Sequence, residues 1–548
     1  MRRDQAFEEA IMSDLKIDHR LGALKTAAIS GRISRRSFME GAIALGMTIP
    51  GALRLWSKDV AAAAPKKGGT FRVGLDDGNT NDSMDPATTN SRFMITMAHT
   101  QRNFLTEISP DNDVVGELAE SWDVSSDAKT WTLKLRKGVE FHNGKTFDAG
   151  DVAATLNYHR GEASKSAAKA LLASVDEIKV ADKNTVVVKL STGNADIPYL
   201  LTDYHLVMLP ADKDGHIDWG NTAGTGGYIV EEFEPGVRAV MKRFPNYWKE
   251  GRAHFDGVNF VAINDATART SALRAGEVDA IIECDFKTLD LLEQNSSITI
   301  DEVPTGTHVS IPAHGDTAPF DNMDVRLALK YAIDREAVIK AVLNGHGSLG
   351  NDHPISPIMP YYNASIPQRA YDPEKAKFHL KKAGMESLKV SLSAADTVIA
   401  GAVDMALLFS ETAKKTGINI EVVREPNDGY WSNVWLKKPF CLAGWGGRPT
   451  PDIIFTLCYA AGAAWNESHF ANDRFNKLLI DARSQLDQKK RAEMYFEMQS
   501  ILHDEGSTIL SFFRNWIYAR RANVAHDAKL TGSWPLDGAR GAERWWFA

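Results

Sequence analysis

The sequence of 548 residues contains few cysteines and no run of them that could organise a fold. Its three cysteines, Cys284, Cys441 and Cys458, are widely spaced and form no Cys-x-x-Cys pair. This spacing excludes a disulfide-stapled scaffold and a zinc ribbon, and it leaves at least one thiol unpaired. A bridge between Cys441 and Cys458 and a set of buried free thiols both remain open, because the sequence does not reveal the pairing.

A concentrated basic tract is also missing. The chain has 63 Lys and Arg residues against 71 Asp and Glu residues, for a formal net charge of -8, and the cations are spread along its length. Such a chain has no electrostatic footprint for nucleic acid, so we expect no nucleic-acid partner. With 44% hydrophobic and 24% charged residues, the composition is that of a globular protein long enough for two to four domains.

The N-terminal region has the order of an export signal. Ser34-Arg-Arg-Ser-Phe38 precedes a moderately apolar stretch from Gly41 to Trp56, and small residues at 61–64 follow before Pro65. The apolar stretch is too short for a membrane span. Residues 1–64 therefore resemble a twin-arginine signal region, which predicts a mature protein in the periplasm. No cysteine lies near the cleavage region, so no lipid anchor is expected.

Helical and strand patterns alternate along the rest of the chain, which predicts an α/β fold without internal repeats. Predicted strands cover residues 69–75, 130–136, 185–190, 237–242, 258–263, 280–283 and 509–513. Predicted helices cover residues 149–159, 267–276, 324–335, 372–384 and 473–503. Gly276 and Gly384 are placed to end their helices, and Asp372 with Pro373 is placed to begin one.

Catalytic and metal-binding patterns fail on their spacing. Ser348 has His346 two residues before it, where a nucleophile elbow needs glycine. Gly144-Lys-Thr146 ends like a phosphate loop, but Gly138 is one position too far away. No His-Glu-x-x-His sequence occurs, and the 15 histidines are dispersed. We therefore expect no enzyme, no cofactor and no metal ligands.

Three phrases between residues 119 and 248 carry a family resemblance. They are Ala119-Glu-Ser-Trp122 running into the segment 135–144, then Gly224-Thr-Gly-Gly-Tyr228, then Arg243-Phe-Pro-Asn-Tyr-Trp248. Together they resemble the extracytoplasmic solute-binding proteins of peptide, nickel and opine ABC importers. The resemblance implies a two-lobe periplasmic-binding-protein fold of the Venus flytrap type, with an extra subdomain in the first lobe.

The same resemblance implies the domain boundaries. Lobe I with its extra subdomain is expected over residues 65–311, lobe II over 312–516, and a C-terminal return to lobe I over 517–548. Crossing strands near 308–312 and 513–517 would form the hinge. The asparagine, tyrosine and tryptophan at the end of the third phrase are expected to be a structural joint of lobe I.

A fourth phrase departs from the resembled family. Gly444-Trp-Gly-Gly-Arg448 continues to Asp452, and Arg448 stands where the peptide-binding relatives have an aspartate that holds the terminal amine of the peptide. A guanidinium at this place repels an ammonium and prefers a carboxylate, sulfonate or phosphate. Trp445 would supply an apolar wall, while Gly446 and Gly447 allow close backbone approach. The alternative is that Arg448 belongs to a structural ion pair.

Weaker site candidates come from loops that line the cleft in the resembled family. They are Asn90, Ser91 and Arg92 after the first strand, Trp465 and Asn466 before the last long helix, and His314 after the first hinge strand. Their side chains could equally point to solvent. Because Arg448 belongs to lobe II, Asn90 to Arg92 are the expected partners from lobe I.

The expected function is capture of a small anionic solute by lobe closure, followed by delivery to an ABC permease of the inner membrane. An opine-like compound or amino-acid conjugate is the first choice of ligand. An anionic metal chelate or a peptide is the alternative, and an exported hydrolase is the alternative from another class. A monomer is expected, and a turnover assay separates the binding protein from the hydrolase.

Overall fold

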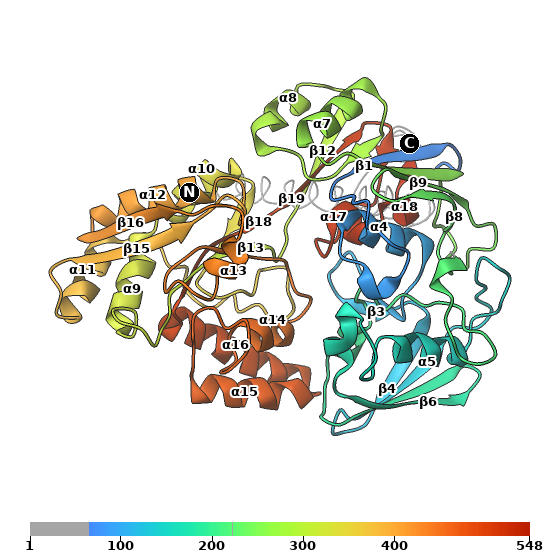
Figure 1. Cartoon of the computed structure of the whole chain (residues 1–548), viewed down its shortest axis with the longest axis horizontal. Coiled ribbons are helices and arrows are strands. Elements are labelled where there is room, and N and C mark those ends of the chain that lie inside the picture. Colours follow the sequence, from blue (N-terminus) through green and yellow to red (C-terminus); the bar gives the residue numbers. More distant parts are fainter. Residues whose placement is uncertain (1–64, 222) are drawn as a thin grey trace, which may run out of the picture.

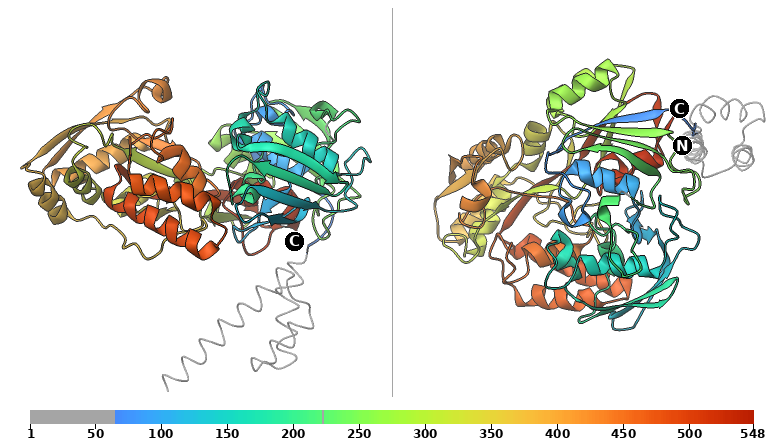
Figure 2. Two further views of the ribbon diagram at one scale, coloured as in Figure 1. Left: turned by 90° about the horizontal axis from the view of Figure 1, so that it is seen from below. Right: turned by 45° about the vertical axis from the view of Figure 1, so that its right-hand side comes forward.

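The computed structural model describes residues 65–221 and 223–548, so the predicted signal region at 1–64 lies outside it. The chain forms two lobes that are joined through a pair of crossing segments (Figures 1 and 2). Lobe I lies on the right and along the top of Figure 1, and lobe II lies on the left. The predicted two-lobe α/β class is confirmed.

Lobe I is built on a seven-stranded sheet that the end of the chain completes. Its strands, in spatial order, are β12 (Ile298–Val303), β19 (Trp516–Arg521), β11 (Ala280–Ile281), β1 (Thr70–Leu75), β10 (Gly257–Ala262), β9 (Arg238–Arg243) and β8 (Tyr228–Glu234). In β1, Phe71, Val73 and Leu75 are buried, as the alternating sequence predicts. Phe71 stacks on Phe255 with ring centroids 4.5 Å apart, near the centre of this core.

Five helices cover the edges and faces of lobe I: α4 (Arg92–Gln101), α7 (Ala266–Ala275), α8 (Leu289–Glu293), α17 (Pro535–Ala539) and α18 (Gly541–Arg544). The C-terminal strands β20 (Val524–Ala525) and β21 (Trp546–Phe547) pair with each other. Helix α7 ends at Gly276, which has a φ of 77°. That left-handed conformation is the physical reason for glycine at this position.

The first lobe also carries a second core of its own. An antiparallel sheet of β4 (Ala119–Val124), β5 (Thr130–Leu135), β7 (Thr185–Leu190) and β6 (Val175–Asp182) packs with α5 (Ala149–Tyr158) and α6 (Ile197–Leu200). The short pair β2 (Thr106–Ile108) and β3 (Val114–Gly116) lies beside α6. Trp131, Leu133 and Leu135 alternate inward on β5. This unit is the structure behind the expected extra subdomain.

Lobe II combines two small sheets with helices. One sheet has the order β14 (Gly347–Leu349), β18 (Thr508–Arg514), β13 (His308–Pro312) and β17 (Ala443–Trp445), and the other pairs β15 (Leu388–Ala394) with β16 (Ile418–Arg424). Around them lie α9 (Met323–Ala332), α10 (Arg335–Leu343), α11 (Pro373–Lys382), α12 (Ala402–Lys414) and α13 (Tyr430–Asn433). A separate helical layer consists of α14 (Pro451–Cys458), α15 (Asp473–Ser484) and α16 (Gln488–Glu505).

Two predicted helices are each broken in the structure. The helix expected over 324–335 ends at Ala332, and Asp334 caps the next helix by accepting a hydrogen bond from the Ala337 amide at 3.0 Å. The helix expected over 473–503 stops at Ser484, and Asp487 caps a second helix. In both cases an aspartate offers an N-cap in the middle of a periodic pattern, and the chain uses it to turn.

The hinge lies slightly earlier than the predicted boundary at 311/312. Strand β12 belongs to lobe I and β13 to lobe II, so the first crossing covers residues 304–307, and the second is Asn515 between β18 and β19. The hydroxyl of Thr305 donates to the Arg514 carbonyl at 2.7 Å, and the Arg514 amide donates to the Thr307 carbonyl at 2.8 Å. The two crossing segments are therefore held side by side.

All three cysteines are buried free thiols, so the bridge that the sequence left open between Cys441 and Cys458 is not formed. Burial raises the pKa of the Cys284 thiol to about 12 and raises the pKa of the other two further. The thiols are consequently protonated and unreactive at neutral pH. Among residues 65–221 and 223–548, no helix has the length and apolarity to cross a membrane.

Candidate functional site

A cavity of about 420 Å³ lies between the two lobes. Lobe I contributes Tyr199, Tyr204 and Trp534 to its wall, lobe II contributes Met359, Arg448 and Trp465, and the hinge contributes Gly306. A space of this size matches the cavities that hold small organic ligands. Both lobes and the hinge form the wall, so a molecule in this cavity contacts all three parts.

The loop that carries Arg448 is packed against the hinge. It runs from the end of β17 to the start of α14, and Gly447 faces Gly306 backbone to backbone. A Cβ atom on Gly306 would lie 3.2 Å from the Cα of Gly447, and one on Gly447 would lie 3.3 Å from the Cα of Gly306. Only glycine on both sides permits this approach without a shift. The contact couples the position of Arg448 to the hinge.

Arg448 is a half-buried cation that has no carboxylate partner among residues 65–221 and 223–548. Its hydrogen bonds in the described chain are weak ones within its own loop, from Nη1 to the carbonyl oxygens of Gly446 at 3.3 Å and Gly447 at 3.4 Å. The alternative of a structural ion pair for Arg448 therefore finds no partner in the described chain. A guanidinium left in this condition retains donors for an incoming anion.

The other charged side chains of the cavity are already engaged. Arg540 forms a bidentate pair with Glu117, with nitrogen to oxygen distances of 2.8 and 2.9 Å. Glu107 pairs with Lys249 at 2.7 Å. Asp203 accepts from His205 Nδ1 at 2.6 Å. Arg448 is thus the charged group of this cavity whose partner is still to be supplied.

Two further titratable groups, Tyr204 and His99, line the same cavity. Burial raises the pKa of Tyr204 to about 12, Asp203 adds to the rise, and the positive charge of Arg448 opposes it. Burial, with help from Arg540, lowers the pKa of His99 to about 3. The phenol and the imidazole are both neutral at pH 7, so they add hydrogen-bonding capacity without adding charge.

Trp445 lies behind the cavity rather than in its wall. Its ring is buried, and its indole Nε1 donates to Glu467 Oε1 at 3.1 Å. Glu467 also accepts from the Ser310 hydroxyl at 2.6 Å and from Trp435 Nε1 at 2.7 Å. Burial raises the pKa of Glu467, and these three neutral donors partly offset the rise. Trp445 therefore anchors the loop from beneath.

The structure brings three of the predicted site residues to the cavity wall: Gly447, Arg448 and Trp465. Gly446 is exposed at the start of the loop and does not line the cavity. Trp465 is 43% exposed, which is high for a tryptophan that packs on other aromatic rings. Contact between these residues and a ligand stays a prediction, and this cavity is where the contact would occur.

The expected partners of Arg448 on lobe I do not reach the cavity. Ser91 caps α4 by accepting from the Met94 amide, and it donates to Asp82 at 2.8 Å. Arg92 forms a bidentate pair with Asp76, at 2.8 and 2.7 Å. Asn90 is exposed on the preceding turn. The capped start of α4 directs this segment toward lobe I. This direction explains why residues in the loop after the first strand do not reach the cavity.

The two remaining candidates also lie elsewhere. The amide nitrogen of Asn466 donates to the carbonyl oxygens of Ala460 and Phe470, at 3.2 and 2.8 Å, so it closes its own loop. The ring of His314 stacks on His469 with centroids 3.8 Å apart. Burial is the main reason that the pKa of His314 is lowered. Neither side chain lines the cavity between the lobes.

Sequence reasoning missed the lobe I wall. Tyr199 and Tyr204 belong to the extra subdomain, and Trp534 belongs to the C-terminal return segment. Their rings meet the cavity together with Arg448 although more than 200 residues separate the two tyrosines from it. No local motif marks them. The only available signal was the expected return of the chain end to lobe I, which brings distant residues to this wall.

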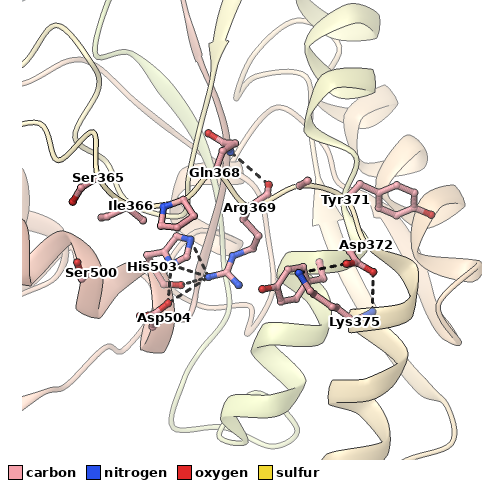
Figure 3. A pocket seen from close by; sticks show the side chains of 13 residues that line it. Ser365, Ile366, Gln368, Arg369, Tyr371, Asp372, Lys375, Ser500, His503 and Asp504 are labelled. Carbon is pink, nitrogen blue, oxygen red and sulfur yellow. Dashed lines mark hydrogen bonds and ion pairs between the residues drawn. The ribbon is translucent and has the colours of Figure 1, made fainter.

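A second cavity, of about 480 Å³, lies within lobe II and has a different character (Figure 3). Its charged groups already have partners: Arg369 pairs with the buried Asp352 at 2.8 Å and donates to the His503 carbonyl at 2.7 Å, while Lys375 lies 3.5 Å from Asp372. Figure 3 shows Arg369 directed at His503 and Asp504. This cavity offers no unpaired charge comparable to Arg448, so the cavity between the lobes is the candidate site.

Two lobes, a double crossing at the hinge and a cavity enclosed between the lobes define a two-lobe binding protein. The model of the family described as "Bacterial extracellular solute-binding proteins, family 5 Middle" matches residues 113–467. The chain belongs to this family, and its resemblance to peptide, nickel and opine receptors is confirmed.

Individual relatives agree with the family assignment. The chain is 29% identical over 441 residues to the dipeptide-binding protein of Escherichia coli (strain K12), which covers 73% of this chain and 80% of that protein. Its fold resembles that of AgaA from A. tumefaciens R10 in complex with agropinic acid, with a TM-score of 0.69, 24% identity and coverage of 88% and 99%. HbpA2 from Haemophilus parasuis gives a TM-score of 0.75 at 22% identity, with coverage of 86% and 99%.

Proposed function

We propose that this protein is the periplasmic solute receptor of an ABC importer and that it captures a small anionic solute between its lobes. We infer the negative charge of the solute from Arg448, a half-buried guanidinium in the cavity with no carboxylate partner in the described chain. A carboxylate that binds this fork in a partly desolvated cavity gains charge-assisted hydrogen bonds. An opine-like compound or an amino-acid conjugate is our first choice of ligand.

Closure of the lobes is the proposed mechanism of capture. Arg448 belongs to lobe II, while Tyr204 and Trp534 belong to lobe I, so one solute contacts both lobes only when they are close together. A ligand shifts an equilibrium between open and closed forms by its differential affinity for the two. The contact between Gly447 and Gly306 supports a direct mechanical link from the solute to the hinge.

Relatives of this chain differ in what they bind. The name of the Escherichia coli relative specifies dipeptides, and the AgaA structure contains agropinic acid. Family membership alone therefore leaves the ligand open. We propose the anion because the cavity charges favour it, with an anionic metal chelate as the second candidate that the same Arg448 would accept. Binding alone, without a chemical step, is sufficient for the proposed role.

The charge of the ligand can be tested without knowing its identity. N-acetyl-alanyl-alanine presents a free carboxylate and a blocked amine, whereas alanyl-alanine amide presents the reverse. We expect calorimetry to detect binding of the acetylated probe and not of the amide. Replacing Arg448 with alanine should weaken the acetylated probe by about 2 to 5 kcal/mol, the range for truncating one partner of a buried charge pair.

Conservative and reversing variants complete this test. Arg448→Lys should recover only part of the affinity, because an ammonium cannot reproduce the bidentate fork. Arg448→Asp should turn the preference toward the amide probe, whose free amine would then find a carboxylate. Preferential binding of alanyl-alanine amide by the natural protein would contradict the proposal and favour an ordinary peptide receptor. Native mass spectrometry of protein from its own periplasm would then weigh the natural solute.

We also propose export by the twin-arginine route, without a lipid anchor, and action as a monomer with an inner-membrane permease. The support is the order of residues 34–64 in the sequence. A receptor reads the arginine pair specifically, so changing Arg35 and Arg36 to lysine should leave precursor in the cytoplasm. N-terminal sequencing of the mature protein should start near Ala64. Normal periplasmic accumulation of the double variant would overturn this route and leave the solute site untouched.

A further inference from the structure

The wall of the cavity between the lobes is apolar over most of its area apart from Arg448. The lobe II part of this wall consists of Ile358, Met359, Pro449, Ile453, Leu457 and Trp465. The lobe I part includes Leu171, Tyr199, Leu200, Tyr204 and Trp534. Apolar walls of this kind favour a ligand that buries apolar surface of its own, because that surface leaves water on binding.

Trp465 is a preorganised surface for such a ligand. Its ring packs on Trp435 and Trp445, with centroid distances of 6.2 and 5.9 Å, while 43% of the residue stays exposed. The neighbours restrict the ring on one side, and the cavity leaves the rest open. A flat group that packs there gains burial and an aromatic contact while the protein loses little side-chain freedom.

An aromatic pair also stands in the lobe I wall. The rings of Tyr204 and Trp534 meet edge to face, at 5.3 Å and 88°. Aromatic surface therefore enters the cavity from both lobes. In contrast, Glu107, Asp203 and Arg540 are engaged in pairs of their own, so a second charge on the solute would find no free partner among them. A second buried charge without a partner is costly.

We infer that the solute is an amphipathic anion, with one carboxylate held by Arg448 and one flat apolar group, aromatic in the simplest case, packed against Trp465. This inference rests on the proposed function, because it takes the anionic end from Arg448. It adds the chemical class of the other end. It also distinguishes among the acids that Arg448 alone would accept, since compact polycarboxylates would lose hydration against an apolar wall.

The test uses three probes that share one carboxylate and differ at one side chain: N-acetyl-alanyl-alanine, N-acetyl-alanyl-tryptophan and N-acetyl-alanyl-glutamate. Calorimetry on the full mature protein should rank tryptophan first and glutamate last. Trp465→Leu should weaken the tryptophan probe by about 3- to 10-fold, the range of one aromatic contact. It should change the alanine probe by less than about twofold.

Trp431 offers a matched control, because it belongs to the same aromatic cluster and is 42% exposed but does not line the cavity. Trp431→Leu should leave all three affinities unchanged. Equal or tighter binding of the glutamate probe, or an equal effect of Trp431→Leu and Trp465→Leu, would overturn the amphipathic class. Binding of all acetylated probes that ignores Arg448→Ala would instead refute the anionic site, and failure of all three to bind would count against both.

Discussion

Two arginines of lobe II, Arg491 and Arg448, face lobe I in opposite conditions. Arg491 on α16 lies 2.8 Å from Asp196 of the extra subdomain, and both side chains are only 2% exposed. Close by, the Ala195 amide donates to the Arg483 carbonyl at 2.8 Å, which adds a backbone bond between the lobes. Arg448 is half-buried at the cavity and has no carboxylate partner in the described chain.

The difference between the two sites indicates a division of labour. The ion pair of Arg491 with Asp196 forms within the chain, so it stabilises contact between the lobes without any ligand. Arg448 can complete its hydrogen bonds only with a molecule from outside. A receptor built in this way keeps its closed form accessible and reserves one strong contact for the solute, which then shifts the balance between open and closed forms.

Breaking the ion pair between Arg491 and Asp196 should have the largest effect on the equilibrium between open and closed forms. Asp196→Ala leaves Arg491 buried without its carboxylate in the closed form, a loss of about 3 to 5 kcal/mol when one partner of a buried pair is removed. Opening relieves this cost, so the radius of gyration from X-ray scattering should rise in the protein without ligand. Arg474→Ala is the control, because Arg474 pairs with Glu497 on the exposed surface at 2.6 Å and such exposed pairs contribute little to stability. Equal scattering curves for both variants would show that the contact does not hold the lobes together.

Crowding the hinge should have a smaller effect on the same equilibrium. In Gly306→Ala the new methyl group lies 3.2 Å from the Cα of Gly447 and 3.6 Å from Met359 Sδ. Overpacking of this kind costs about 1 to 3 kcal/mol, and we expect it as weaker binding of N-acetyl-alanyl-alanine. In Gly446→Ala the methyl group meets only Arg448 Nη1, at 3.4 Å, so this variant of the same loop should bind nearly normally. A reversed order of the two variants would contradict the link between loop and hinge.

Acidification separates the two contact regions. Asp452 lies near the ion pair of Arg491 with Asp196. Burial raises the pKa of Asp452 to about 6, while Arg483 opposes the rise. A carboxyl whose folded pKa is raised contributes stability at low pH that is lost as the pH rises through about 6. Between pH 7 and pH 5 the closed form should therefore gain stability over a form that exposes Asp452, by on the order of 1 kcal/mol, because the exposed carboxyl has a lower pKa. Scattering without ligand should show greater compaction at pH 5 than at pH 7, and Asp452→Asn should abolish this pH dependence. Expansion of the natural protein at pH 5 would be the opposite result.

The smallest effect on the protein without ligand is expected at Arg448, which has no ion pair in the described chain. Arg448→Ala removes no ion pair within the described chain, so thermal unfolding without ligand should change by less than about 0.5 kcal/mol, as for an ordinary surface substitution. A melting temperature several degrees lower would show that Arg448 is structural. That outcome would place Arg448 in the same class as Arg491 and remove the basis for an anionic solute.

Local patterns were sufficient for most of the elements that were predicted. The strand predicted over 185–190 has these bounds in the structure, and Asp372 caps α11 by accepting from the Lys375 amide at 2.9 Å. These predictions succeed because alternation and capping depend on neighbours in the chain. The prediction of one long helix over 473–503 is wrong, because the chain reverses near Asp487 and α15 packs on α16. The sequence periodicity continues through this point and does not show the reversal.

The site was only partly accessible to the same reasoning. Arg448 was found because its loop carries a motif, and Trp465 because its loop has a known place in the family. Tyr199, Tyr204 and Trp534 were missed, since they come from the extra subdomain and the chain end and follow no motif. The segment 90–92, predicted to line the cleft, does not line this cavity, and Ser91 caps α4 instead.

The sequence by itself predicted the family, the alternation of helices and strands, and an arginine at position 448 where the resemblance implies an aspartate. Only the tertiary structure decided that Arg448 has no carboxylate beside it while Arg491 does. The reason is physical, because the partner of a charged side chain comes from a distant part of the chain and only folding brings the two together. Asp196 reaches Arg491 across 295 positions of sequence, and no group of the described chain reaches Arg448 in the same way.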